Sequence, residues 1–514
     1  MMDRVLFGQA YFLRFDPKLW AAQQPYAPLG TLYAAACVRE RGYEVSLFDA
    51  MLASSQREWV EMLDRLRPRF AVVYEDSFNY LSKMCLLRMR EAALSMVSAA
   101  RKRGAQVIVA GSDATDHAST YLAGGADVVV TGEGEATLVE VLDTLSGRAA
   151  GGLEAIDGVC YARETGVVRT RRRELIRELD GLPYPAWDLV DVEQYRRVWL
   201  KRHGYFSMNL SSTRGCPYHC NWCAKPIYGQ HYTARSPESV AREVEWLGTT
   251  YRPDHLWIAD DIFGLKPGWV EQFAQLLASR GAAIPFKCLM RADGVTDPIV
   301  SALRTARCRT VWIGAESGSQ KILDAMEKGV RVEQIRQAAA RLHAAGIEVG
   351  FFLQFGYPGE TKEEIAQTLD MVRTCRPDDI GISVSYPLPG TPFYERVKSE
   401  LGAKQNWVDS DDLDLMYSGT YVAEYYRALH ALTHADFRAR RVLEPFGPQT
   451  RPSLRSRRQR LRATASGLWQ AVRLPLLRHR LRRLSRLRSP NLVPVLSPRL
   501  SPQAAAVPTE QPGA

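Results

Sequence analysis

FSMNLSSTRGCPYHCNWC, residues 206–223, combines a strand pattern with three closely spaced cysteines. FSMNLSST (206–213) has the composition of a buried β-strand, and a Gly- and Pro-containing turn follows it. Cys216, Cys220 and Cys223 come directly afterwards, so they lie at the carboxyl end of that strand. Parallel α/β sheets place their ligands at this edge. We therefore expect a cofactor site here.

The alternation of strand and helix patterns continues beyond the cysteines. Further strand patterns, each followed by an amphipathic helical pattern, occur at 255–261, 286–292, 310–316, 348–355 and 379–386. Six successive βα units predict a partial (β/α)6 barrel of TIM type over residues 205–399, two units short of a complete barrel. The distinctive motifs fall at the ends of these strands, where function is expected.

A separate alternation occupies residues 1–150. Apolar strand patterns occur there at 5–8, 43–50, 69–76, 105–111 and 126–132, with amphipathic stretches between them. This order predicts a flavodoxin-like (Rossmann-like) domain of the α/β class, built on a doubly wound and mostly parallel sheet. Residues 151–204 are predicted to be a linker that contains a β-hairpin.

The C-terminal part differs in composition. Residues 400–445 are predicted to be helical, and residues 446–514 form an Arg- and Pro-rich tail that we expect to be disordered. Leu477, Leu481 and Leu484 share one helical face between arginines in this tail, and Trp469 precedes them. Two alternatives therefore remain for the tail: an interfacial helix that contacts a membrane peripherally, and a disordered segment in solvent.

Charge and cysteine content narrow the class of protein. The chain has 514 residues and a net charge of +10, but fourteen Arg and one Glu lie in residues 446–514, which leaves −3 for residues 1–445. Nothing in that larger part suggests a nucleic-acid partner. Neither a signal peptide nor an apolar run of ~20 residues is present, so we expect a cytoplasmic protein. Nine cysteines in such a chain favour a metal site over disulfides.

Three interpretations of the cysteine group remain. A zinc site needs four ligands, and no paired His or Cys supplies the fourth. Buried cysteines without a ligand fit poorly with three thiols so close together. A [4Fe–4S] cluster is normally held by four thiolates, so three would leave one iron open to a further ligand.

The cysteine spacing resembles that of the radical S-adenosylmethionine (SAM) superfamily. Supporting motifs are IADDIFG (258–264), IGAESGSQKILDAMEKG (313–329), GYPGET (356–361) and YPLPGTPFY (386–394). The resemblance implies a [4Fe–4S] cluster on Cys216, Cys220 and Cys223, with SAM on the open iron.

The resemblance also implies SAM contacts at the strand ends. Trp222 would flank the adenine, and Arg291 would meet the SAM carboxylate, with an ordinary ion pair as its alternative. The other expected contacts, to the ammonium or to ribose hydroxyls, are Asp260, Asp261, Glu316 and Ser317. A helix N-cap is the open alternative for Asp261. The remaining six cysteines are expected only to pack.

The N-terminal domain resembles the cobalamin-binding domain of radical SAM enzymes. The stretches that carry this resemblance are 28–50, 107–115 and 127–142. They imply that two loops embrace the cobalamin, through Gly111, Ser112, Thr115, Gly132, Glu133, Gly134 and Glu135. The Asp-x-His-x-x-Gly motif is absent, so no histidine ligand to the cobalt is expected.

The combined resemblance implies an enzyme that cleaves SAM reductively and uses cobalamin. The leading hypothesis is a class B radical SAM methyltransferase that methylates an unactivated carbon of a small molecule, as a monomer supplied by a flavodoxin- or ferredoxin-type electron donor. The alternatives are an anaerobic magnesium-protoporphyrin monomethyl ester cyclase and a cobalamin- or redox-sensing regulator. A tRNA methylthiotransferase is set aside, because the N-terminal cysteines are few and scattered. No catalytic residue beyond the cofactor ligands is assigned.

Overall fold

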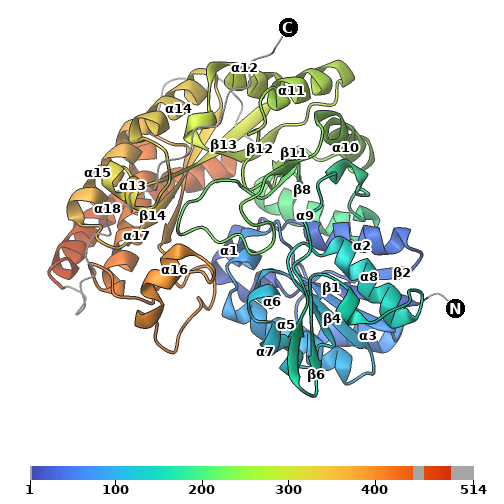
Figure 1. Cartoon of the computed structure of the whole chain (residues 1–514). Coiled ribbons are helices and arrows are strands. Elements are labelled where there is room, and N and C mark those ends of the chain that lie inside the picture. The colour runs from blue at the N-terminus through green and yellow to red at the C-terminus, as the bar shows by residue number, and fades with distance from the viewer. Residues whose placement is uncertain (1–2, 444–456, 488–514) are drawn as a thin grey trace, which may run out of the picture.

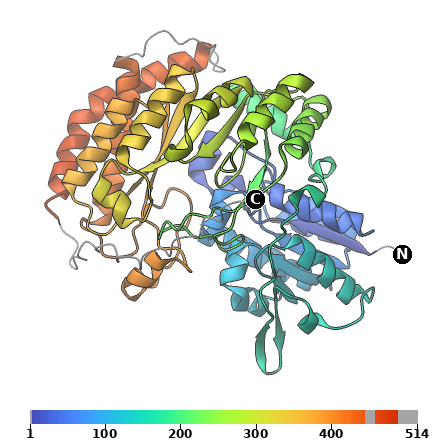
Figure 2. The ribbon, with the colours of Figure 1, turned by 45° about the horizontal axis from the view of Figure 1, so that its top comes forward.

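Two α/β domains and two long C-terminal helices make up the computed structural model, which describes residues 3–443 and 457–487 (Figure 1). The N-terminal domain and the six-stranded domain lie side by side, and the C-terminal helices lie on the far side of the latter (Figure 2). This arrangement confirms the α/β class and the order of domains expected from the sequence.

The N-terminal domain is built on a seven-stranded sheet of order β2-β1-β3-β4-β5-β6-β7. Strands β1 to β5 are parallel, and a closing hairpin, β6 and β7, pairs antiparallel with β5, so the sheet continues beyond residue 150. The strands are β1 (Arg4–Gly8), β2 (Glu44–Phe48), β3 (Phe70–Tyr74), β4 (Gln106–Ala110), β5 (Val128–Val130), β6 (Val159–Arg163) and β7 (Gly166–Arg169).

Helices cover both faces of this sheet, as expected for a doubly wound domain. Side chains of α2 and α8 pack on one face, whereas those of α3, α5 and α7 pack on the other. The helices are α1 (Pro17–Ala22), α2 (Leu29–Glu40), α3 (Arg57–Leu66), α4 (Tyr80–Lys83), α5 (Leu87–Arg101), α6 (Ser112–Asp116), α7 (Ala118–Ala123) and α8 (Glu135–Ser146), and α9 (Val192–His203) leads to the second domain.

The second domain contains the predicted six parallel strands in the order β15-β14-β13-β12-β11-β8. These strands are β8 (Ser207–Leu210), β11 (His255–Ile258), β12 (Phe286–Met290), β13 (Cys308–Glu316), β14 (Glu348–Phe355) and β15 (Asp379–Val384). The helices between and after them are α10 (Pro237–Thr250), α11 (Trp269–Arg280), α12 (Asp297–Thr305), α13 (Gln320–Ala325), α14 (Val332–Ala344), α15 (Lys362–Cys375) and α16 (Pro392–Val397).

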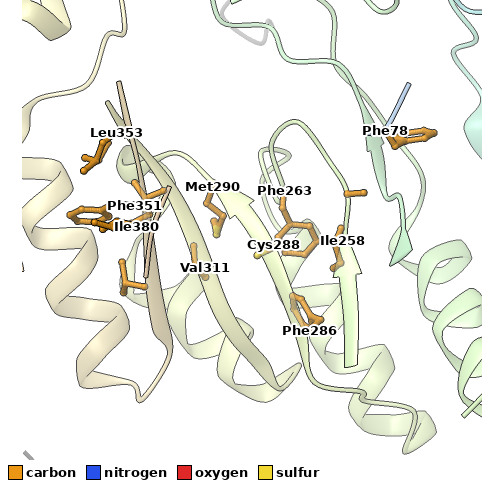
Figure 3. Close-up of a cluster of buried hydrophobic side chains, with 14 of the residues drawn as sticks. Phe78, Ile258, Phe263, Phe286, Cys288, Met290, Val311, Phe351, Leu353 and Ile380 are labelled. Carbon is orange, nitrogen blue, oxygen red and sulfur yellow. The ribbon is translucent and has the colours of Figure 1, made fainter. Parts of the chain in front are cut away.

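Strand alternation separates the two faces of this half-barrel. Phe286 and Cys288 from β12, Val311 from β13 and Phe351 from β14 are buried in one continuous apolar cluster (Figure 3). The residues between them point to the opposite face, where Phe352 stays 38% exposed. Cys288 is therefore a packing residue, as expected.

The C-terminal region departs from two expectations. Residues 401–422 are largely irregular rather than helical, and the helix begins only at α17 (Ala423–Leu443). The expected disorder of the tail is wrong for α18 (Arg457–Leu484), which packs against α17 through leucines. The expected disorder of residues 446–456 and 488–514 concerns residues outside the described part of the chain.

Candidate functional site

The cysteine loop (residues 215–232) connects two short antiparallel strands, β9 (Thr213–Arg214) and β10 (Thr233–Ala234), at the carboxyl end of β8. Its three cysteines, Cys216, Cys220 and Cys223, are partly buried and form no disulfide. Burial raises the pKa of the Cys216 thiol, and it raises the pKa of Cys223 to about 12. A bound metal would therefore have to stabilise their thiolate forms.

Asp260 fixes the chain just ahead of the cysteine loop. Its carboxylate accepts hydrogen bonds from the backbone N–H groups of Ser212 (2.8 Å) and Thr213 (3.0 Å), and from the Ser211 hydroxyl (3.2 Å). Burial raises the pKa of Asp260 to about 6 although these bonds favour the carboxylate. The structure thus shows a positioning group, and a contact from Asp260 to SAM stays a prediction.

Two residues that the sequence did not single out hold the middle of the cysteine loop. Asn221 Nδ2 donates to the carbonyl oxygen of Ala325 (2.8 Å), and the backbone N–H of Asn221 donates to the carbonyl oxygen of Met326 (3.1 Å). The Tyr357 hydroxyl donates to Asn221 Oδ1 (3.0 Å) and lies at the end of β14. Asn221 lies between Cys220 and Cys223 in the sequence, and this position is the feature from which its role in the loop could have been predicted.

Cationic side chains surround the cysteine loop. The Arg291 guanidinium lies 3.5 Å from the centroid of the Tyr218 ring and donates to the Lys328 carbonyl oxygen (2.9 Å). Lys328 Nζ lies 2.8 Å from Glu316 Oε1. Both cations lie within electrostatic reach of the Cys220 thiol. Arg291 also pairs with Asp293 (Nη2 to Oδ2, 2.9 Å), so the ion pair expected as its alternative is present, and its contact to the SAM carboxylate stays a prediction.

The expected SAM residues at the end of β13 are bonded to other side chains and backbone groups of the protein. Glu316 ends this strand with a φ of 57°, and it pairs with Lys328 as described. The Ser317 hydroxyl lies 3.1 Å from Thr368 Oγ1 and accepts from the Ser319 N–H (3.1 Å). Ser317 is fully buried. Contacts from Glu316 and Ser317 to ribose hydroxyls therefore remain predictions.

The three thiols of the cysteine loop fit the donor set of a [4Fe–4S] cluster. Within the described residues, no three His, Cys, Asp or Glu side chains converge as ligands of one ion. In a [4Fe–4S] cluster each thiolate binds a different iron, so the sulfurs need not converge on one point. The Nε1 donor of Trp222, in the same loop, is buried and has no hydrogen-bond partner among the described residues.

The expected cobalamin loops follow β4 and β5. The Thr115 hydroxyl donates to the Gly111 carbonyl oxygen (2.8 Å) and accepts from the Gly132 N–H (3.2 Å), so it joins the two loops. A Cβ atom at Gly134 would lie 2.7 Å from the Tyr74 hydroxyl, so a side chain there would force the Tyr74 ring to move. These contacts shape the edge of the sheet where the resemblance places the corrin.

Polar atoms without partners mark the same edge. They are Gln9 Nε2 after β1, Glu75 Oε2 after β3 and Ser112 Oγ after β4, all buried and without a hydrogen-bond partner among the described residues. Burial raises the pKa of Glu75 to about 8, so its carboxyl group can donate as well as accept. Such groups suit the carboxamide side chains of a corrin, so the edge fits cobalamin.

The two loop systems are joined by a buried ion-pair group, the Arg214 clamp, formed by Arg214, Glu133 and Glu135. The guanidinium reaches Glu133 Oε1 at 2.5 Å and Glu135 Oε1 at 2.7 Å. All three side chains are at most 5% exposed. Burial raises the pKa of Glu133, against the attraction of Arg214. Both glutamates thus bond to the chain next to Cys216, and their contacts to cobalamin stay predictions.

Other singled-out residues also lie at the domain interface. Asp261 pairs with Lys83 of the N-terminal domain (2.5 Å) and is not the N-cap of a helix. Tyr386, which follows β15, donates to the Met84 carbonyl oxygen of the N-terminal domain (3.0 Å).

Comparison with known proteins assigns both domains. Residues 210–372 match the radical SAM superfamily, and residues 21–142 match the B12 binding domain. The chain is 30% identical to an uncharacterised methyltransferase of Pyrococcus horikoshii, over 55% of this chain and 60% of that protein. It is 24% identical to the anaerobic magnesium-protoporphyrin IX monomethyl ester cyclase of Synechocystis, over 71% of this chain and 72% of the cyclase.

A solved structure shares the fold. OxsB, a cobalamin-dependent SAM radical enzyme solved with aqua-cobalamin and SAM bound, superposes with a TM-score of 0.70. The match covers 93% of this chain and 72% of OxsB at 16% sequence identity, which shows a common fold. The two family matches imply a [4Fe–4S] cluster, SAM and cobalamin as cofactors. The chain thus contains a radical SAM domain preceded by a B12-binding domain.

Proposed function

We propose that this enzyme is a cobalamin-dependent radical SAM methyltransferase that methylates an unactivated carbon of a small-molecule substrate. The observation that carries the proposal is the Arg214 clamp, which bonds the expected cobalamin loop to the chain that enters the cysteine loop. Two cofactors bound at these loops would lie close to each other at the domain interface. The P. horikoshii relative, named as a methyltransferase, supports the same reaction class.

Different residues would bind the cluster and contact the substrate. When bound, the cluster supplies the electron that cleaves SAM, and cobalamin supplies the methyl group. Cys216, Cys220 and Cys223 would hold the cluster, and the Arg291–Asp293 and Lys328–Glu316 ion pairs lie beside them. The partly exposed ring of Phe352, which stacks on Trp312 on the sheet face opposite the buried apolar cluster, offers an apolar surface to a substrate. An external flavodoxin- or ferredoxin-type protein would deliver the electron.

The test is anaerobic reconstitution of the full chain with iron, sulfide and cobalamin, followed by reaction with methyl-labelled SAM and a reductant. We expect 5′-deoxyadenosine, S-adenosylhomocysteine and label retained on bound cobalamin. Replacement of the three cysteines by Ala should abolish the cluster absorbance and the 5′-deoxyadenosine. A reconstituted protein that holds both cofactors but never cleaves SAM would contradict the proposal and favour a regulator.

A ring-closing cyclase is the second candidate, and the Synechocystis relative favours it. The two candidates differ in their products. Magnesium-protoporphyrin monomethyl ester offered as substrate should remain unchanged if the enzyme is a methyltransferase. Ring closure with formation of 5′-deoxyadenosine, and without transfer of the methyl label, would establish the cyclase instead.

A further inference from the structure

Helix α18 is fixed to the folded protein by one of its faces. Leu477 is buried against Leu432 and Ala435 of α17, and Leu474 and Leu481 pack beside it. Arg478 Nη2 adds an ion pair to Asp436 Oδ1 of α17 (3.1 Å). The helix therefore has a defined inner face, and its orientation on α17 is set.

The opposite face of α18 is apolar and exposed. Large side chains recur on it with the three- and four-residue spacing that places them along one side of a helix. This outer face consists of Leu461 (63% exposed), Leu468 (48%), Trp469 (62%), Val472 (73%) and Leu476 (69%). No other segment in the described part of the chain covers this outer face.

Positive charge borders this outer face. Arg473, Arg480, Arg483 and Arg486 are exposed along α18 or just beyond its end. Residues 457–487 contain no Asp or Glu, so no acidic side chain within the segment neutralises them. Long arginine side chains beside an apolar stripe can place their guanidinium groups at the level of lipid headgroups while the stripe enters the acyl boundary.

We propose that the outer face of α18 docks the protein on an anionic lipid surface, with the helix lying in the plane of the headgroups. The apolar stripe and its indole group match the acyl boundary, and the arginines match the phosphates. In residues 3–443 and 457–487, no helical segment combines the length and the apolar composition of a bilayer span. A nucleic-acid surface would use the charge but leave the apolar stripe without a partner.

The position of α18 agrees with this role. In both views α17 and α18, in red, lie on the side of the half-barrel that faces away from the N-terminal domain (Figures 1 and 2). Docking through α18 would therefore leave the interface between the two cofactor domains uncovered. Docking through α18 does not depend on which reaction the enzyme catalyses.

The test is co-sedimentation of the full chain with phosphatidylcholine vesicles, with and without about one quarter phosphatidylglycerol. We expect binding that requires phosphatidylglycerol and weakens with salt. The variant Trp469→Ser/Val472→Ser/Leu476→Ser should bind at least ~10-fold more weakly, because it removes the buried apolar area. The variant Val167→Ser/Leu200→Ser, which alters exposed apolar residues far from α18, should bind like the wild type.

A second measurement does not depend on the folding of the triple variant. Brominated phosphatidylcholine in the anionic vesicles should quench tryptophan fluorescence of the wild type, and Trp469→Phe should lose that quenching while it still binds. Equal sedimentation of the wild type and a folded triple variant would overturn the proposal. Tight binding to an oligonucleotide with no binding to either vesicle would also overturn it and assign α18 to nucleic acid.

Discussion

At the scale of single residues, the site is arranged largely by carboxylates that bond to their own chain. Asp260 accepts several hydrogen bonds from the end of β8, and Glu316 pairs with Lys328. These groups set the positions of the strand ends before any cofactor binds. Asp261 differs, since its side chain is 31% exposed beside Lys83. It is therefore the carboxylate of this group with the most freedom to meet a ligand.

Glu360 provides a test at the residue scale. It accepts from the Gly356 N–H (2.6 Å), while its other oxygen is buried without a hydrogen-bond partner among the described residues. Burial raises the pKa of Glu360 to about 8, and Glu364 adds to the shift. Between about pH 4.5 and 8, therefore, the Glu360 carboxyl group is protonated in the folded protein but ionised in the unfolded chain. Stability should fall across that window as pH rises, by roughly 1.4 kcal/mol per pH unit from this group.

Glu360→Gln should remove this contribution to the pH dependence, because the amide keeps the shape without the charge. Urea unfolding of the two proteins at several pH values between 5 and 8 measures it. We expect the variant to match the wild type near pH 5 and to exceed its unfolding free energy near pH 8. A loss of stability in Glu360→Gln that is the same at every pH would contradict the assignment of a buried neutral carboxyl group.

At the scale of elements, the loop between β13 and α13 determines how closely α15 can approach. A Cβ atom at Gly318 would lie 2.3 Å from the Gln367 carbonyl oxygen of α15. The Gly318 N–H also donates to Thr368 Oγ1 (2.9 Å). The helix and the loop that contains the expected SAM residues are thus in backbone contact, so a change in one must move the other.

Gly318→Ala should therefore destabilise the protein by about 1–3 kcal/mol, because a rigid backbone atom occupies the space of the new methyl group. Gly402→Ala is the matched control, since no atom lies within 4 Å of its Cβ position. Thermal unfolding of both variants compares them directly. Similar midpoints for the two would show that the loop and α15 separate at little cost.

The strands and helices of both domains were largely predictable, whereas their contacts were not. The parallel strands are short apolar runs followed by amphipathic helices, and that local signal is strong. The β-hairpin was predicted, but its addition to the first sheet depends on pairing with β5, which no local pattern specifies. For α18, an Arg-rich composition suggested disorder, while packing of its leucines on α17 decides the outcome.

At the scale of the whole molecule, one arginine links the two domains. Arg214 lies 81 residues from Glu133 and 79 from Glu135, which is why the sequence suggested separate roles for the glutamates and none for the arginine. The grouping of the three cysteines in one loop follows from their spacing in the sequence, and their role as cluster ligands stays a prediction. Their relation to the N-terminal loops was not predictable, since it arises only when the domains meet.

Arg214→Met should cost about 3–5 kcal/mol of unfolding free energy, because it leaves two buried carboxylates without their cation. Adding Glu133→Gln and Glu135→Gln to that variant should recover part of the loss, since the uncompensated charge is then removed. Urea unfolding of the three proteins measures both effects. Arg57→Met is the control, because the Arg57–Glu61 pair is exposed and should contribute at most ~0.5 kcal/mol. If Arg214→Met cost no more than Arg57→Met, the clamp would not hold the cofactor domains together.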